Sequence, residues 1–148
     1  MKNKINIVII DDNKIDCFIT KKIISLVFKN TYSKVFNSGI NALEYFSQIQ
    51  IDSDKNPIFC TDLILLDINM PLMSGFEFLN KLSKMKAFKK NPIEVYFLSS
   101  SNNKEDLSKA EKNPYCSGYI NKPLSKDKLN RLIKNKTECG NKFILSFL

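Results

Sequence analysis

The chain of 148 residues contains no histidine, and its four cysteines are far apart in the sequence. Without histidine, the Ser-His and Cys-His pairs of nucleophilic catalysis are excluded. A zinc site would need all four thiolates, and the cysteines lack the short spacing that such sites use. We therefore expect free thiols in a reducing compartment. The cysteines are Cys17, Cys60, Cys116 and Cys139.

Long apolar runs are also missing. No run approaches the roughly 18 residues that a transmembrane helix needs. The short apolar run before Asp11 is followed by carboxylates and not by the small-residue cleavage site of a signal peptide. These absences predict a cytoplasmic chain with no membrane insertion.

The chain has a clear excess of positive charge, with 23 basic and 15 acidic residues and a net charge of +8. The lysines are scattered, with at most two adjacent, and they form no nucleic-acid motif interleaved with aromatic residues. This pattern is typical of a solvated lysine-rich surface. We therefore expect no nucleic-acid partner.

Strand-like apolar runs alternate with helical patterns, which predicts a single α/β domain with a parallel sheet. One helix is expected to face the core with an apolar stripe made of Ile15, Phe18, Ile19, Ile23, Leu26 and Val27. The segment 51–61 is expected to be a surface loop, and the apolar tail 141–148 either adds a strand or packs onto the surface. The expected strands are 5–10, 32–36, 63–66, 93–98 and one around 119–120. The expected helices are 14–29, 40–50, 75–88, 103–112 and 125–135.

Polar side chains follow four of these apolar runs directly. Asp11 and Asp12 follow IVII, and Asp67 follows LILL. Ser99 follows VYFL, and Lys122 follows GYIN. Because the carboxyl ends of parallel strands line one crevice, where ligands bind, we expect these groups to meet there.

Three carboxylates in one crevice need a cation. In the doubly wound order 2-1-3-4-5, the first and third strands are neighbours, so Asp11, Asp12 and Asp67 come together. Two like charges about 4 Å apart repel by roughly 4 kcal/mol at an effective dielectric near 20. A hard, all-oxygen site of this kind suits Mg²⁺. With the metal held by Asp12 and a carbonyl from the following loop, Asp67 is the expected phosphoryl acceptor, because carboxylates form covalent phosphoryl intermediates.

These residues stand in segments that resemble a known family. IVIIDDN (7–13), LILLDINMPLMSGFEFL (63–79), VYFLSSSNN (95–103) and SGYINKPLS (117–125) are similar to the receiver domain of two-component response regulators, in the style of the stand-alone chemotaxis regulators. The resemblance spans about residues 5 to 134. It implies a flavodoxin-like (βα)5 fold with a five-stranded sheet in the order 2-1-3-4-5.

The resemblance implies a role for each metal-site residue. Asp67 would be the phosphoacceptor, and Asp12 a direct ligand of Mg²⁺. Asp11 would act mostly through water, and the backbone carbonyl of Asn69 would complete the metal shell.

The resemblance also implies a switch. Ser99 would be the switch hydroxyl and Lys122 the contact for the phosphoryl oxygens. Tyr119 would turn inward on phosphorylation, although the same ring is also consistent with an ordinary strand aromatic. The added charge of about −1.5 to −2 would then repack the face formed by the helix at 103–112, the strand at 119–120 and the helix at 125–135. Pro123 would follow a cis peptide bond.

The sequence as a whole predicts a single-domain response regulator. Residues 1–135 would form the receiver, and residues 136–148 a C-terminal extension with no separate output domain. A histidine kinase or phosphotransfer protein would phosphorylate Asp67, and the product would bind a downstream target protein. We expect a monomer or weak homodimer that catalyses only its own phosphorylation and dephosphorylation.

Two alternatives stay open at this point. One is a Mg²⁺-dependent phosphohydrolase with an aspartyl-phosphate intermediate, which would usually carry an acid/base Asp where Asn69 stands. The other is a basic binding protein whose acidic crevice is inert.

Overall fold

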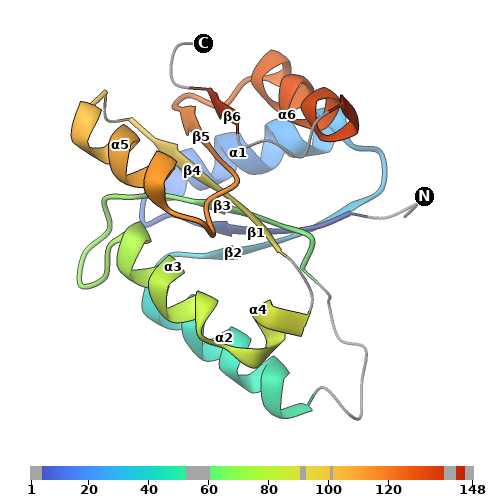
Figure 1. The fold of residues 1–148 in the computed structure, drawn as a ribbon. Coiled ribbons are helices and arrows are strands. Elements are labelled where there is room, and N and C mark those ends of the chain that lie inside the picture. Colours follow the sequence, from blue (N-terminus) through green and yellow to red (C-terminus); the bar gives the residue numbers. More distant parts are fainter. Residues whose placement is uncertain (1–4, 53–60, 91–92, 101, 139–142, 146–148) are drawn as a thin grey trace.

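A computed structural model describes residues 5–52, 61–90, 93–100, 102–138 and 143–145. Its centre is one parallel sheet in the order β2-β1-β3-β4-β5-β6 (Figure 1). The predicted order 2-1-3-4-5 is confirmed, and β6 extends the sheet beyond β5, which is the first of the two alternatives for the tail. Residues 141–142 and 146–148 of that tail lie outside the described residues. The strands are β1 (Ile5–Ile10), β2 (Thr31–Phe36), β3 (Leu63–Leu66), β4 (Glu94–Ser99), β5 (Gly118–Asn121) and β6 (Phe143–Leu145).

Helices cover both faces of the sheet, as the alternating sequence pattern predicts. Helices α1 and α6 lie on one face, and α2, α3 and α4 lie on the other (Figure 1). Each face has its own apolar cluster, and α5 contributes Ala110 to the cluster beneath α2 and α3. The helices are α1 (Lys14–Val27), α2 (Gly39–Asp52), α3 (Gly75–Ser83), α4 (Lys86–Lys90), α5 (Lys104–Lys112) and α6 (Lys126–Glu138).

The pairing of β1 with β3 sets the position of the acidic residues. Both strands are continuous apolar runs because each is buried on both faces of a parallel sheet. Ile10 pairs with Leu66 at the end of the ladder. The next residues stay in register, since the Asp67 N–H donates to the Ile10 carbonyl at 2.9 Å and the Asp11 N–H donates to the Phe36 carbonyl at 3.1 Å. Asp11 and Asp67 therefore leave neighbouring strands at the same edge of the sheet.

The predicted core stripe of α1 was right only in part, because Ile23 and Val27 pack against the core cluster but the other four residues are exposed. Ile15 and Phe18 are each 71% exposed, whereas Cys17 and Ile24 are buried against the sheet, in the face that also holds Thr20. Apolar residues occupy two faces of this helix, so their spacing alone did not select the buried one. The rotation of α1 about its own axis, which decides the buried face, is set instead by the short connection after β1. The Cys17 thiol donates to the Asp11 carbonyl at 3.3 Å, which turns this face toward the strand.

The predicted helix 75–88 is two helices. Helix α3 ends at Ser83, where the Lys84 N–H bonds the Lys81 carbonyl and the Met85 N–H bonds the Leu82 carbonyl. Such i→i−3 bonds tighten the last turn and end the α-helical ladder. The segment predicted as a loop at 51–61 begins later than expected, because α2 continues to Asp52. Residues 53–60 of that segment lie outside the described residues.

The buried cysteines and the helix lengths bear on two further expectations. Cys17 and Cys116 are buried thiols that are not in disulfides, and burial raises the pKa of Cys17 to about 11. Cys60 and Cys139 lie outside the described residues. None of the helices in the described part of the chain combines the length and apolarity needed to span a bilayer.

Candidate functional site

The turn between β1 and α1 holds the first two carboxylates in place. Asn13 is the N-cap of α1, and its side-chain oxygen accepts from the Ile15 and Asp16 N–H groups. Asp11 in turn accepts from the Asn13 N–H at 2.9 Å. This chain of local bonds satisfies helix-end donors and leaves Asp12 exposed at the tip of the turn.

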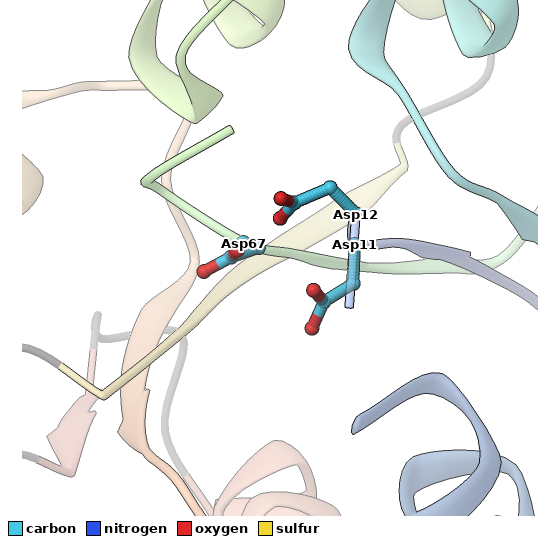
Figure 2. Close-up of side chains that lie close together, drawn as sticks. All are labelled: Asp11, Asp12 and Asp67. Carbon is cyan, nitrogen blue, oxygen red and sulfur yellow. The ribbon is translucent and has the colours of Figure 1, made fainter. Parts of the chain in front are cut away.

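The three predicted carboxylates do come together. One oxygen each from Asp11, Asp12 and Asp67 can be chosen so that all lie within 4.8 Å of one another. Figure 2 shows Asp11 and Asp12 projecting to different sides of the chain after β1, with Asp67 beside them at the end of β3. Asp11 and Asp67 are buried, and Asp12 is open to solvent. The cluster of carboxylate oxygens therefore meets solvent at Asp12.

Lys122 reaches this cluster from the loop after β5. Its ammonium donates to Asp11 at 2.7 Å and to Asp16 at 2.9 Å, and it lies 3.6 Å from Asp67. Burial lowers the pKa of Lys122, but the hydrogen bonds to Asp11 and Asp16 outweigh it and hold the pKa above its usual value. The lysine is therefore a fixed positive charge.

The loop that carries Lys122 is held by its backbone. The Lys122 N–H donates to the Ser99 carbonyl at 2.8 Å, and the Lys122–Pro123 peptide bond is cis, as predicted. A second lysine, Lys128 of α6, is buried and donates to the carbonyls of Asn121 at 2.7 Å and of Pro123 at 2.9 Å. These bonds fix the loop on both sides of Lys122.

Asp67 has an unusual protonation equilibrium. The pKa of Asp67 is raised to about 7, because burial and, to a smaller extent, the carboxylates of Asp11 and Asp12 raise it by more than Lys122 lowers it. A carboxylate needs its charge to act as a nucleophile. A cation among these oxygens would favour the charged form, because opposite charge lowers an acid's pKa.

The loop after β3 packs tightly against Asp67. The Gly75 N–H donates to the Ile68 carbonyl at 2.8 Å, and a β-carbon at Gly75 would clash with the Asp67 carbonyl oxygen. Only glycine permits this approach. Ser74 and Glu77 form a capping box that starts α3 beside the strand end. Asn69 is exposed two residues after Asp67, and the role of its carbonyl stays a prediction.

Ser99 of β4 and Tyr119 of β5 lie on the side of Asp67 away from Asp11 and Asp12, and both are buried. Ser99 is 0% exposed at the end of β4, and Tyr119 is 1% exposed in the apolar cluster beneath α2, α3 and α5. Burial raises the pKa of Tyr119, and a side-chain hydrogen bond with Ser99 lowers it. The two hydroxyls are therefore coupled, and the ring is in the inward position.

The donors fit Mg²⁺. They are all carboxylate oxygens, at strand ends that the sheet fixes, with one of them open to water. Sequence reasoning missed two residues of this region, Asp16 and Lys128. Asp16 lies in the first turn of α1, where an acidic residue is common because it complements the helix dipole, so its contact with Lys122 had no specific signal in the sequence. The role of Lys128 had no signal either.

Comparisons with known proteins agree on the family. The model of the response regulator receiver domain matches residues 7–134. The two-component response regulator ARR17 of Arabidopsis thaliana is 30% identical over 147 residues, with 94% of this chain and 89% of that protein covered. The probable transcriptional regulator ycf29 of Pyropia yezoensis is 36% identical over 101 residues. That match covers 68% of this chain and only 40% of the relative.

A solved structure shows the same fold. The crystal structure of a two-component response regulator from Cytophaga hutchinsonii superposes with a TM-score of 0.77 at 28% identity, covering 92% of this chain and 99% of that one. The fold and the acidic crevice define a receiver of the doubly wound α/β class. The chain belongs to the response regulator receiver domain family of two-component signalling.

Proposed function

We propose that this receiver is phosphorylated on Asp67 in a Mg²⁺-dependent reaction and acts as a switch in a phosphorelay. The observation that carries the proposal is the position of Asp67, which lies beside the carboxylates of Asp11 and Asp12 and 3.6 Å from the Lys122 ammonium. A nucleophile, a metal site and a fixed cation are the parts that phosphoryl transfer needs.

Each residue has a distinct task in this reaction. Asp11, Asp12 and the carbonyl of Asn69 would hold Mg²⁺, which supplies positive charge to the phosphoryl oxygens. An oxygen of Asp67 forms the new bond to phosphorus as the bond from phosphorus to the donor breaks, and the bonding pair leaves with the donor. Lys122 then neutralises charge on the equatorial oxygens.

A protein phosphodonor suits the surface around the crevice. Ile15 and Phe18 are each 71% exposed on the first turns of α1, and Leu72 is 91% exposed in the loop after Asp67. All three belong to segments that leave the same edge of the sheet as the carboxylates. Apolar groups beside a reactive centre favour protein contact, so we assign the donor as a histidine kinase or phosphotransfer protein.

The response would pass through the buried hydroxyls. A phosphoryl group offers acceptor oxygens to Ser99, and Ser99 is coupled to Tyr119. The face formed by α5, β5 and α6 would then repack and bind a downstream target protein. We further propose that residues 1–135 form the switching unit and that the extension 136–148 adds β6 at the edge of this face.

Intact mass measurement tests the assignment. The chain and its Asp67→Asn variant are incubated with acetyl phosphate and Mg²⁺, with and without EDTA. We expect a gain of one phosphoryl group in the parent only, and only with the metal. Asp127→Asn, on the exposed side of α6, is the matched control and should be phosphorylated like the parent.

The phosphohydrolase alternative predicts a different result. Rapid turnover of many phosphomonoesters without a lasting mass increase would favour that enzyme class. Phosphorylation that persists in Asp67→Asn would show that another residue is the acceptor.

A further inference from the structure

Asp16 has no part in the function proposed above, yet it contacts the lysine at the centre of the site. Its Oδ2 accepts from the Lys122 ammonium at 2.9 Å, and Oδ2 of Asp11 accepts from the same ammonium at 2.7 Å. The distance from that ammonium to Asp67 is 3.6 Å, which is too long for a hydrogen bond. Lys122 is thus held on the α1 side of the site and away from the acceptor carboxylate.

The two partners of Lys122 differ in how easily they can be exchanged. The side chain of Asp11 is 2% exposed, and leaving it without its cation would strand a buried charge. The side chain of Asp16 is 33% exposed, so water can replace the lysine at little cost. A group that draws the ammonium toward Asp67 would therefore displace Asp16 first.

A phosphoryl group on Asp67 is such a group. It replaces one carboxylate charge with about −1.5 to −2 and adds acceptor oxygens. The ammonium has three donor hydrogens, and two already point to Asp11 and Asp16. One hydrogen is left for the phosphoryl oxygens, so the ammonium can bond more than one of them only by giving up Asp11 or Asp16.

We propose that Asp16 is a positioning residue that competes with the phosphoryl group for Lys122. The Asp16–Lys122 ion pair of the unmodified chain is exchanged for contact between Lys122 and the phosphoryl oxygens. The exchange rests on the proposed function. Its consequence is that the first turn of α1, with the exposed Ile15 and Phe18, is tied to the β5–α6 loop only in the unmodified state.

Binding of beryllium fluoride, a mimic of the phosphoryl group, measures the competition at equilibrium. In the presence of Mg²⁺, Asp16→Asn should bind the mimic more tightly than the parent by about fivefold, because the competing acceptor is lost. Asp16→Glu keeps the charge and should bind like the parent. Glu44→Gln on the exposed side of α2 removes one negative charge that is not part of the carboxylate cluster and should change nothing.

A double-mutant cycle separates positioning from a simple loss of charge. In the Lys122→Met background, Asp16→Asn should no longer tighten binding. An equal gain in both backgrounds, or no gain in the parent background, would overturn the competition. If Lys122→Met binds too weakly to measure, thermal unfolding without metal or mimic completes the cycle. Asp16→Asn should then lower Tm in the parent and leave Tm of Lys122→Met unchanged, and equal lowering in both would overturn the ion pair.

The two proposals fail in different ways. If the parent and Asp67→Asn bind the mimic equally, the acceptor assignment is wrong and the exchange is overturned with it. If the parent binds the mimic and Asp67→Asn does not, while Asp16→Asn matches the parent, only the exchange is overturned.

Discussion

On one side of Asp67, the carboxylates of Asp11, just after β1, and of Asp16 in α1 hold Lys122 by charge. On the other side, Ser99 and Tyr119 are neutral groups buried in the sheet. The charged side borders solvent and can change partners without moving the backbone. The neutral side is packed on all sides and changes only when its neighbours repack. If Asp67 is phosphorylated as proposed, we expect the change in charge to cause repacking only across β4 and β5.

The largest expected effect is the removal of the buried ring. Tyr119→Ala should lower the free energy of unfolding by about 3–5 kcal/mol, because it empties a core site. Urea unfolding measures it. Tyr119→Phe is the control and should cost about 1 kcal/mol, since only the hydroxyl is lost. Similar costs for both variants would show that the ring contributes little to the core.

The next effect lies on the charged side. Lys122→Ala leaves Asp11 buried without its cation, and unfolding free energy should fall by about 3 kcal/mol without metal. Mg²⁺ should recover part of this loss, because an ion that binds only the folded state stabilises it.

Lys128→Ala is the matched control for that experiment. Lys128 is also a buried lysine, but its ammonium bonds the carbonyls of Asn121 and Pro123. Its loss should destabilise the fold without making stability more dependent on Mg²⁺ than in the parent. Equal metal dependence of both variants would contradict the electrostatic role given to Lys122.

The strands and the acidic residues on the charged side of Asp67 could be predicted from the sequence. β1 and β3 were predicted with the bounds observed, since continuous apolar runs ended by carboxylates are typical of central parallel strands. The meeting of Asp11, Asp12 and Asp67 followed from strand order alone. These features depend on local pattern and on one topological rule.

Other features depend on tertiary contacts and were not predictable from local pattern. The buried face of α1 is set by the cap at Asn13 and the bond from Cys17 to Asp11, not by the number of apolar residues. The bond from Lys122 to Asp16 joins residues 106 positions apart. A long lysine side chain can reach several acidic residues, and their spacing in the sequence does not indicate which of them it contacts.

The raised pKa of Asp67 should make the stability of the fold depend on pH. The folded pKa of Asp67 is raised from 3.8 to about 7, so the folded chain binds more protons than the unfolded chain between these values. Stability from this group is present below pH 3.8 and is lost as the pH rises toward 7. Without metal, Asp67→Asn should therefore be more stable than the parent by about 2 kcal/mol at pH 8.

Chemical unfolding at several pH values measures this difference. The gain should vanish near pH 3, below both pKa values, where Asp67 is protonated in the folded and unfolded states. Mg²⁺ should reduce the gain at pH 8 by stabilising the parent. A gain that is the same at both pH values would show that charge on Asp67 is not its cause.

The smallest effect concerns the two hydroxyls. Ser99→Ala should cost about 1 kcal/mol, and a double-mutant cycle with Tyr119→Phe should give a coupling of roughly 0.5–1 kcal/mol for their hydrogen bond. Urea unfolding at low and high salt separates the two sides of Asp67. The Ser99–Tyr119 coupling joins neutral, buried groups and should not change with salt, whereas the coupling of Asp16 with Lys122 should weaken because Asp16 is open to solvent. A salt-sensitive hydroxyl coupling would mean that charge at Asp67 acts on β4 and β5 directly, without repacking as the intermediate step.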